Sequence, residues 1–294
     1  MSDFLELMVS VGEAGGIYSL AALAYLVILR PTGIINFATG EWATFGAFAG
    51  VAYVVWAHIP YVIALPLVVA TVGIVAIVTE RLTVRPLIER NAPVLSPVLA
   101  LLGMFIIYRE TTIWIFGTAN QYAPAPLGFG RVEIGPFGGA SQSFLIIGVT
   151  ALVFIGAWYF FEKTVWGKAF QAVAIDRFAA GLMGINLNRV TALSFFAGGV
   201  IAGLAGLMQS PLTSASYLMG LPLAIKGFSA LVIGGVGRVE GALLGGLLLA
   251  LIEKLVLRYA PVPSGFALGV PLLLLILFLL VRPTGLLQAK ESRS

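Results

Sequence analysis

Long apolar runs alternate with short polar breaks along this chain, and the runs have the lengths of membrane-spanning helices. The hydrocarbon core of a bilayer is about 30 Å thick, so a helix needs about 20 apolar residues to cross it, and fewer where it is broken or re-entrant. This window predicts an all-α, polytopic membrane protein with about nine hydrophobic segments, among which broken or re-entrant helices are allowed. The segments lie near residues 7–29, 42–58, 60–79, 95–116, 143–161, 190–210, 222–237, 239–257 and 266–281.

Two pairs of segments are joined by very short connections. The second and third are separated only around His58-Ile-Pro60, and the seventh and eighth only around Gly237-Arg-Val239. Because such a short connection turns the chain back at once, each pair is predicted to form antiparallel neighbours joined at a membrane face.

Composition supports the membrane assignment and excludes several classes of function. Hydrophobic residues make up 60% of the 294 and charged residues 10%, with a mean hydropathy of +1.03, whereas soluble domains carry about 25% charged residues. The chain has no Cys and a single His, His58, which argues against thiolate or His-rich metal sites and a Cys nucleophile. No G-x-x-x-x-G-K-S/T, H-E-x-x-H or G-x-S-x-G motif occurs. We therefore expect neither enzyme activity nor a cofactor in this chain.

The distribution of basic residues predicts the orientation in the membrane. With the N-terminus outside and the C-terminus in the cytoplasm, twelve Lys and Arg fall in cytoplasmic segments and only Arg131 and Arg258 fall outside. The segment 117–142 is then external and the segment 162–189 cytoplasmic. Because the basic residues are scattered singly, nucleic acid is not an expected partner. The twelve are Arg30, Arg81, Arg85, Arg90, Lys163, Lys168, Arg177, Arg189, Arg238, Arg282, Lys290 and Arg293.

The N-terminus carries acidic residues in Met1-Ser-Asp-Phe-Leu-Glu6, where a cleavable signal peptide would carry basic ones. The first hydrophobic segment is therefore expected to direct membrane insertion itself.

The cytoplasmic segment 162–189 contains apolar residues at helical spacing, namely Phe170, Val173, Ala174, Phe178 and Leu182. This spacing predicts a short amphipathic helix that is broken at Gly181 and Gly184. The pattern fits two roles equally well: a helix resting on lipid headgroups, or a helix presented to the groove of a cytoplasmic partner.

A polar break separates the first two hydrophobic segments. Pro31 and Gly33 are predicted to end the first helix, and Asn36, Thr39 and Glu41 then place hydrogen-bonding groups beside apolar sequence. Irregular backbone at membrane depth is tolerated inside protein or near water, and broken helices of this kind often line transport sites. A capped turn at the membrane surface is the alternative interpretation.

Charged residues inside the hydrophobic segments are a further set of candidates, because each costs about 2.5–3.5 kcal/mol to insert on translocon scales. Arg109-Glu110 and Glu253-Lys254 compensate their own charges in sequence and are predicted to extend toward the membrane surface. Glu13 and Lys226 have no such neighbour. They are the better candidates for a pathway or an interhelical contact.

Small residues recur at a spacing of four, which allows helix backbones to approach closely. Examples are Gly199-x-x-x-Gly203, Ala202-x-x-x-Gly206 and Gly241-x-x-x-Gly245. In addition, Arg30-Pro-Thr-Gly33 recurs as Arg282-Pro-Thr-Gly285, which fits either a pseudo-repeat of two halves in parallel orientation or a stop signal used twice.

The motifs, taken in order, resemble one family. Gly33-Ile-Ile-Asn-Phe-Ala-Thr-Gly-Glu-Trp-Ala-Thr-Phe-Gly-Ala47 resembles the N-terminal motif of the LivH/LivM permeases of branched-chain amino acid ABC importers, and is closer to LivH. The run from Gly167 to Ile185 is similar to the cytoplasmic coupling segment of that family. Further matches, in family order up to about residue 287, are Ala202-Gly-Leu-Ala-Gly206, Val232-Ile-Gly-Gly-Val-Gly237, Gly241-Ala-Leu-Leu-Gly-Gly246 and Arg282-Pro-Thr-Gly-Leu286.

The resemblance implies a single transmembrane permease domain, 1–294, in a bacterial inner membrane. It also implies alternating access driven by two separate ATPase subunits that bind ATP and Mg, a second LivM-like permease subunit, and a periplasmic binding protein that docks on 117–142. The implied coupling residues are Gly167, Lys168, Asp176, Ala180, Gly184 and Ile185. The substrate-pathway candidates remain those indicated by the polar break and the unpaired charges, namely Asn36, Thr39, Glu41, Glu13 and Lys226.

Two positions depart from the family pattern. The family often has His where this chain has Thr39, and a basic residue where it has Gln171. The substrate is therefore expected to be a branched-chain amino acid or a related small polar solute such as urea or an amide. The alternatives from other classes are a stand-alone secondary transporter or channel, which would need its own coupling-ion residues, and a membrane scaffold, which would need no polar pathway.

Overall fold

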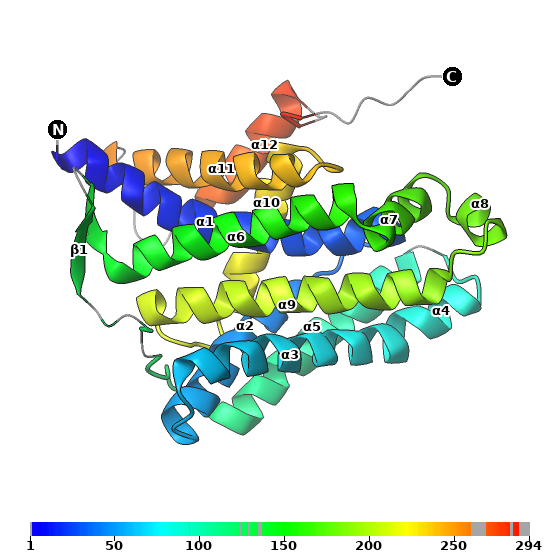
Figure 1. Cartoon of the computed structure of the whole chain (residues 1–294), viewed down its shortest axis with the longest axis horizontal. Coiled ribbons are helices and arrows are strands. Elements are labelled where there is room, and N and C mark those ends of the chain that lie inside the picture. Colours follow the sequence, from blue (N-terminus) through cyan, green and yellow to red (C-terminus); the bar gives the residue numbers. More distant parts are fainter. Residues whose placement is uncertain are drawn as a thin grey trace. The chain divides into compact units, whose positions relative to one another are not determined.

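The chain folds almost entirely into helices. A computed structural model describes residues 2–93, 95–123, 125–126, 128, 130–134, 137–259, 269–282 and 285–287. A single antiparallel hairpin is the only sheet within these residues, with Arg131 opposite Ala140. The elements are α1 (Ser2–Thr32), α2 (Thr39–Val51), η1 (Ala52–Trp56), α3 (Tyr61–Thr79), η2 (Glu80–Val84), α4 (Arg85–Glu89), α5 (Leu95–Phe116), β1 (Arg131–Ile134), β2 (Phe137–Ala140), α6 (Ser141–Lys163), α7 (Val165–Ile175), α8 (Arg177–Leu182), α9 (Leu187–Thr213), α10 (Gly220–Gly234), α11 (Val239–Tyr259) and α12 (Gly269–Val281) (Figure 1).

The predicted hydrophobic segments coincide with these helices, which confirms an all-α polytopic membrane protein. Residues 266–268 of the last segment lie outside the described residues. In the described part of the chain, five helices are long and apolar enough to cross a membrane, and α10 and α12 are shorter apolar helices. The five span Phe4–Thr32, Tyr61–Glu89, Leu95–Phe116, Ser141–Lys163 and Leu187–Thr213.

Helices α1 and α12 end close to the glycine and proline residues of the predicted turns. Helix α1 stops at Thr32, and Gly33 follows with a φ of +68°, a conformation that only glycine adopts without strain. Arg282 directly follows α12, and Gly285 has a φ of +80°. The first Arg-Pro-Thr-Gly sequence therefore forms the end of α1, with Gly33 directly after the helix, whereas the second begins directly after α12. An internal repeat stays a prediction.

The chain divides into two compact units. Three of the four boundaries fall inside α1, α6 and α10, and the fourth falls between residues 124 and 125. Unit 1 comprises Met1–Leu26, Ala125–Phe154 and Ile225–Ser294, and unit 2 comprises Val27–Pro124 and Ile155–Ala224.

Unit 2 is built on close packing of α9 against α2 and α3. A side chain on Gly46 or Gly206 would collide with the backbone of α9 or α2, respectively, and a Cβ on Gly203 would lie 2.9 Å from the Val72 side chain of α3. The small-residue spacing on α9 therefore serves the helix packing that the sequence predicts. Trp42 and Phe195 fill the space between α2 and α9, with ring centroids 5.9 Å apart.

Unit 1 uses the same device between α1 and α11. A Cβ on Gly15 would lie 2.8 Å from Leu247, and a side chain on Gly246 would collide with Ser19. The Ser19 hydroxyl donates to the Leu243 carbonyl over 3.0 Å. This bond satisfies a polar side chain that is completely buried in the apolar interior.

Candidate functional site

A buried polar connection joins α1 to α2, and we call residues 33–41 the polar link. Asn36 and Thr39 are 1% and 2% exposed. The Asn36 side-chain oxygen accepts from the Ala38 amide over 3.0 Å, and the Thr39 hydroxyl donates to the Asn36 carbonyl over 2.8 Å. These bonds hold an irregular backbone inside protein, which is where such a backbone can exist at membrane depth.

Two polar atoms of the polar link lack a hydrogen-bond partner among the described residues. They are the amide nitrogen of Asn36 and the Oε2 atom of Glu41, and Glu41 is only 1% exposed. Glu41 lies in the first turn of α2, where a negative charge is favoured by the helix dipole. Buried polar groups without protein partners are rare, so these two atoms are candidates for contact with a solute.

The start of α10 packs against Glu41. A Cβ on Gly220 would lie 2.7 Å from both Glu41 Oε1 and the Thr44 hydroxyl, and a Cβ on Gly40 would lie 2.7 Å from Ala224. A side chain at position 220 would therefore crowd the Glu41 carboxylate and the Thr44 hydroxyl.

Arg109 on α5 is a neighbour of this site that the sequence did not indicate. We predicted that Arg109 and Glu110 extend toward the membrane surface. Glu110 is exposed, but Arg109 is half-buried and interacts electrostatically with Glu41. Its guanidinium also lies 5.6 Å from the ring centroid of Tyr217. The partner of Arg109 is 68 positions away in sequence, so adjacency along the chain gave no signal.

Within unit 1, Lys226 belongs to a buried polar cluster. Its ammonium donates to Glu253 Oε1 and to the Tyr18 hydroxyl, each over 2.7 Å. The side chains of Lys226 and Glu253 are 18% and 6% exposed. The prediction that Glu253 extends to the membrane surface beside Lys254 is therefore wrong: its partner is Lys226, one helix away. Lys226 makes the interhelical contact that was one of its two predicted roles.

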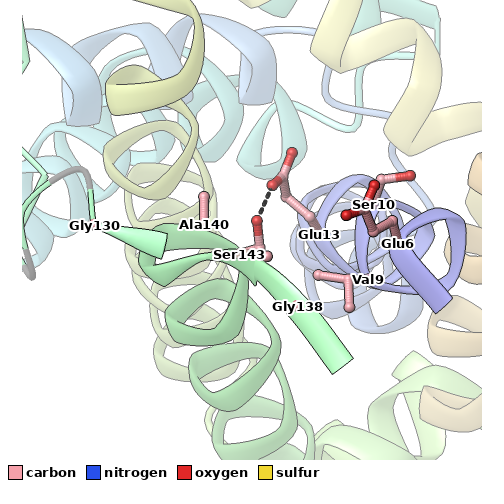
Figure 2. A pocket seen from close by; sticks show the side chains of 9 residues that line it. Glu6, Val9, Ser10, Glu13, Gly130, Gly138, Ala140 and Ser143 are labelled. Atoms are coloured by element: carbon pink, nitrogen blue, oxygen red, sulfur yellow. Dashed lines mark hydrogen bonds between the residues drawn. The ribbon is translucent and has the colours of Figure 1, made fainter. Parts of the chain in front are cut away.

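Glu13 lies at a cavity of unit 1 with a volume of about 340 Å³. Figure 2 shows Glu13 of α1 pointing toward Ser143 at the start of α6, and the Ser143 hydroxyl donates to the Glu13 carboxylate. Glu6 and Ser10 of α1, with Gly138 and Gly139 of the hairpin, form other parts of the wall. Glu13 thus faces a cavity of mixed lining that is large enough for a small molecule.

The segment 162–189, which is predicted to be cytoplasmic and is called the cytoplasmic segment, forms two short helices where the sequence predicts one helix broken at Gly181 and Gly184. The break lies at Asp176, between the end of α7 and the start of α8. The predicted break at Gly181 is wrong, since Gly181 lies inside α8. The Asp176 side chain accepts from the Ala179 amide over 2.9 Å and so caps the start of α8. Thr164 caps α7 in the same way, accepting from the Gly167 amide over 3.0 Å. The predicted end at Gly184 is confirmed by its φ of +85°.

The other predicted coupling residues are packed or exposed in distinct ways. Gly167 lies so close to α6 that a Cβ would collide with the Phe160 carbonyl. Lys168 is exposed and pairs with Glu162 over 3.3 Å. Ala180 is buried, and its carbonyl accepts from the Ile185 amide over 3.1 Å.

The apolar residues of this segment do not form a single face. Phe170 and Val173 are buried, Phe170 against the rings of Phe160 and Phe161. Phe178 and Leu182, predicted to lie on the same stripe, are exposed because the chain turns at Asp176. Together with Ile175 and Met183 they leave an apolar surface in which each side chain is at least 74% exposed. We call these four residues the apolar patch.

The predicted pathway residues fall into two groups. Asn36, Thr39 and Glu41 lie together in unit 2, whereas Glu13 and Lys226 lie in unit 1. The segment 117–142 is described in part: it contains the hairpin, and Gln121 forms an isolated bridge with Ala215. In the described residues, no group of three or more His, Asp or Glu side chains could hold a metal ion.

Apolar helices of spanning length define a polytopic membrane protein, and it carries buried polar groups inside its helix bundle. The family described as "Branched-chain amino acid transport system / permease component" matches residues 7–279. The chain belongs to this family, and it is a permease component of a transport system rather than an enzyme.

Relatives match over nearly the whole chain. The high-affinity branched-chain amino acid transport system permease protein BraD of Pseudomonas aeruginosa is 30% identical, covering 98% of this chain and 97% of the relative. The permease protein LivH of the corresponding Escherichia coli system is 31% identical, with coverages of 98% and 96%. A probable LivH of Methanocaldococcus jannaschii is 29% identical, with coverages of 97% and 94%.

Proposed function

We propose that this chain is the LivH-type permease subunit of an ABC importer for branched-chain amino acids or related small polar organic solutes. The single observation that carries this proposal is the match along the whole chain to permeases of branched-chain amino acid transport systems. In this proposal the chain crosses a bacterial inner membrane with its N-terminus outside and its C-terminus in the cytoplasm.

The proposed partners are a second LivM-like permease subunit, two ATPase subunits and a periplasmic substrate-binding protein. ATP and Mg would bind to the ATPase subunits. The segment 117–142 is the proposed docking site for the binding protein, and 162–189 the proposed docking site for an ATPase subunit.

The apolar patch supports docking at the cytoplasmic segment. Ile175 and Met183 are 87% and 84% exposed although both are strongly apolar. A short helix that presents apolar side chains fits a hydrophobic groove on a partner. Closure of an ATPase dimer would then move α7 and α8 and alternate the access of the pathway.

The polar link supports a pathway role for Asn36, Thr39 and Glu41. A zwitterionic or amide solute carries hydrogen-bond donors and acceptors, and these complement the unpartnered amide of Asn36 and carboxylate oxygen of Glu41. Glu13 and Lys226 are proposed as further polar groups along the route or as contacts between helices.

Reconstitution tests the proposal directly. The chain is expressed together with the proposed ATPase, second permease and binding-protein subunits from the same organism, and the assembly is placed in proteoliposomes. ATP-dependent uptake of radiolabelled leucine, isoleucine or valine is expected, and a urea or acetamide arm tests the other solutes. Uptake that proceeds without ATPase subunits and follows an ion gradient would contradict the proposal and indicate a secondary transporter.

A further inference from the structure

The two helices of the cytoplasmic segment are attached to the rest of unit 2 in different ways. Helix α7 is held against α6, where Phe170 packs on Phe160 and the Gln171 amide donates to the Phe161 carbonyl over 2.8 Å. Helix α8 carries part of the apolar patch and begins at Arg177. The Arg177 side chain is half-buried and reaches away from α8 to two other elements.

Arg177 bridges the end of α1 and the start of α9. One terminal nitrogen donates to the Pro31 carbonyl over 3.3 Å, and the other donates to the Thr191 hydroxyl over 3.4 Å. The planar, forked guanidinium can make both bonds at once, which a lysine ammonium on a single stem does less well. Burial lowers the pKa of Arg177, yet an arginine remains charged in proteins, so its hydrogen bonds are charge-assisted.

The Pro31 carbonyl lies in the last turn of α1, where backbone carbonyls lack partners within the helix. Helix α1 ends at Thr32. A positive charge at that end also interacts favourably with the helix dipole. Arg177 therefore caps α1 at the point where the chain leaves the helix and enters the polar link.

From these contacts we infer that Arg177 is the positioning residue that transmits movement of the cytoplasmic segment to the polar link. This inference rests on the proposed function, since it requires an ATPase to move α8. A displacement of the apolar patch is carried by the first residue of α8 to Pro31, and from there along the chain to Asn36 and Glu41. Arg177 itself contacts neither the ATPase nor the solute in this scheme.

The test measures coupling rather than activity alone. The full transporter is reconstituted with Arg177→Gln, Arg177→Lys or the matched control Arg189→Gln, which removes an exposed positive charge from the same segment. ATP hydrolysis and solute uptake are measured on the same proteoliposomes. For Arg177→Gln, uptake per ATP hydrolysed is expected to fall about tenfold, as for the loss of a charge-assisted hydrogen bond, while the ATPase still co-purifies.

The other two variants test whether the effect comes from the hydrogen bonds of Arg177 or only from loss of a positive charge in the segment. Arg177→Lys, which can still reach one acceptor, is expected to restore part of the ratio, and Arg189→Gln is expected to match the unmodified chain. An unchanged ratio in Arg177→Gln overturns the inference, and so does loss of ATPase co-purification, because that result would make Arg177 a docking residue.

Two further comparisons keep the outcome decisive. If Arg177→Gln fails to accumulate, Thr191→Val removes one acceptor while retaining the charge, and an unchanged ratio in this variant overturns the inference. Failure of the proposed function gives a different result, because the unmodified chain would then neither bind an ATPase nor take up solute with ATP.

Discussion

Glu41 is a carboxylate in a place where packing alone would favour an apolar side chain. It is 1% exposed, and its Oε2 atom has no hydrogen-bond partner in the described residues. Burial of a polar group without a partner costs about 1–3 kcal/mol in proteins. A role in the pathway would explain why this position tolerates that cost.

We predict that Glu41→Gln lowers uptake about tenfold, because a charged hydrogen bond to the solute becomes a neutral one. Glutamine keeps the size of the side chain, so the packing of Glu41 against Gly220 is preserved. The matched control is Glu80→Gln, at an equally buried carboxylate that pairs with Arg85 over 3.0 Å. Uptake is measured per folded protein. The control should lose stability but retain uptake, and equal uptake in both variants would contradict a pathway role.

At Gly184, substitution by alanine is expected to be mild and substitution by proline severe. Nothing lies within 4 Å of a Cβ built there, but φ is +85°. Alanine should therefore cost about 1–2 kcal/mol locally through backbone strain. Proline, fixed at a φ of about −65°, cannot adopt this conformation, and it removes the bond from the Gly184 amide to the Gly181 carbonyl.

The expected result is that Gly184→Ala retains most uptake and ATPase co-purification, whereas Gly184→Pro loses both. Co-purification with a tagged ATPase and uptake in cells check this prediction. Normal ATP-driven uptake by the proline variant would contradict the coupling role of the segment.

Helices α10 and α11 are joined in unit 1 by the Lys226–Glu253 ion pair. Removal of one partner leaves a buried charge unpaired, which typically costs about 3–5 kcal/mol. We predict that Lys226→Met and Glu253→Gln each lower the thermal unfolding midpoint in detergent, and that the double variant recovers part of the loss. Additive effects in this double-mutant cycle would show that the two side chains are not coupled.

Local pattern predicted the helices because apolar length is a property of consecutive residues. The ends at Gly33 and Gly184 were also predictable, since glycine and proline act on the backbone at their own positions. The break at Asp176 was missed because a capping aspartate in mid-segment resembles any polar residue.

The contacts of the charged side chains could not be read from the sequence for a different reason. Glu253 and Lys254 are adjacent and opposite in charge, yet a helix points them in different directions, and only Glu253 meets Lys226. Arg109 and Glu41 interact across separate helices. Phe178 and Leu182 continue the period of Phe170 but are exposed. Each of these outcomes depends on where a distant element lies.

Only 10% of the residues in the whole chain are charged, and the structure shows how several of them are used. Several charged side chains have partners inside the protein. Lys226 pairs with Glu253, and Arg177 donates to the Pro31 carbonyl at the end of α1. The chain offers no phosphate-binding motif, so in the proposed transporter the energy comes from another subunit. Most other basic residues then remain available to set the orientation in the membrane.

Cysteine labelling tests that orientation, because the chain contains no Cys. Ala125→Cys and Ile175→Cys mark the predicted external and cytoplasmic segments, and Ile175 is 87% exposed. With the positive residues inside, a membrane-impermeant maleimide should label position 125 in intact cells and position 175 only after permeabilisation. Ala22→Cys, at a position with no exposed surface, is the control and should react only after denaturation. Labelling of position 175 in intact cells, with position 125 protected, would show that the orientation is the opposite of the predicted one. The segment 162–189 would then lie outside the cell, where no ATPase subunit could bind it.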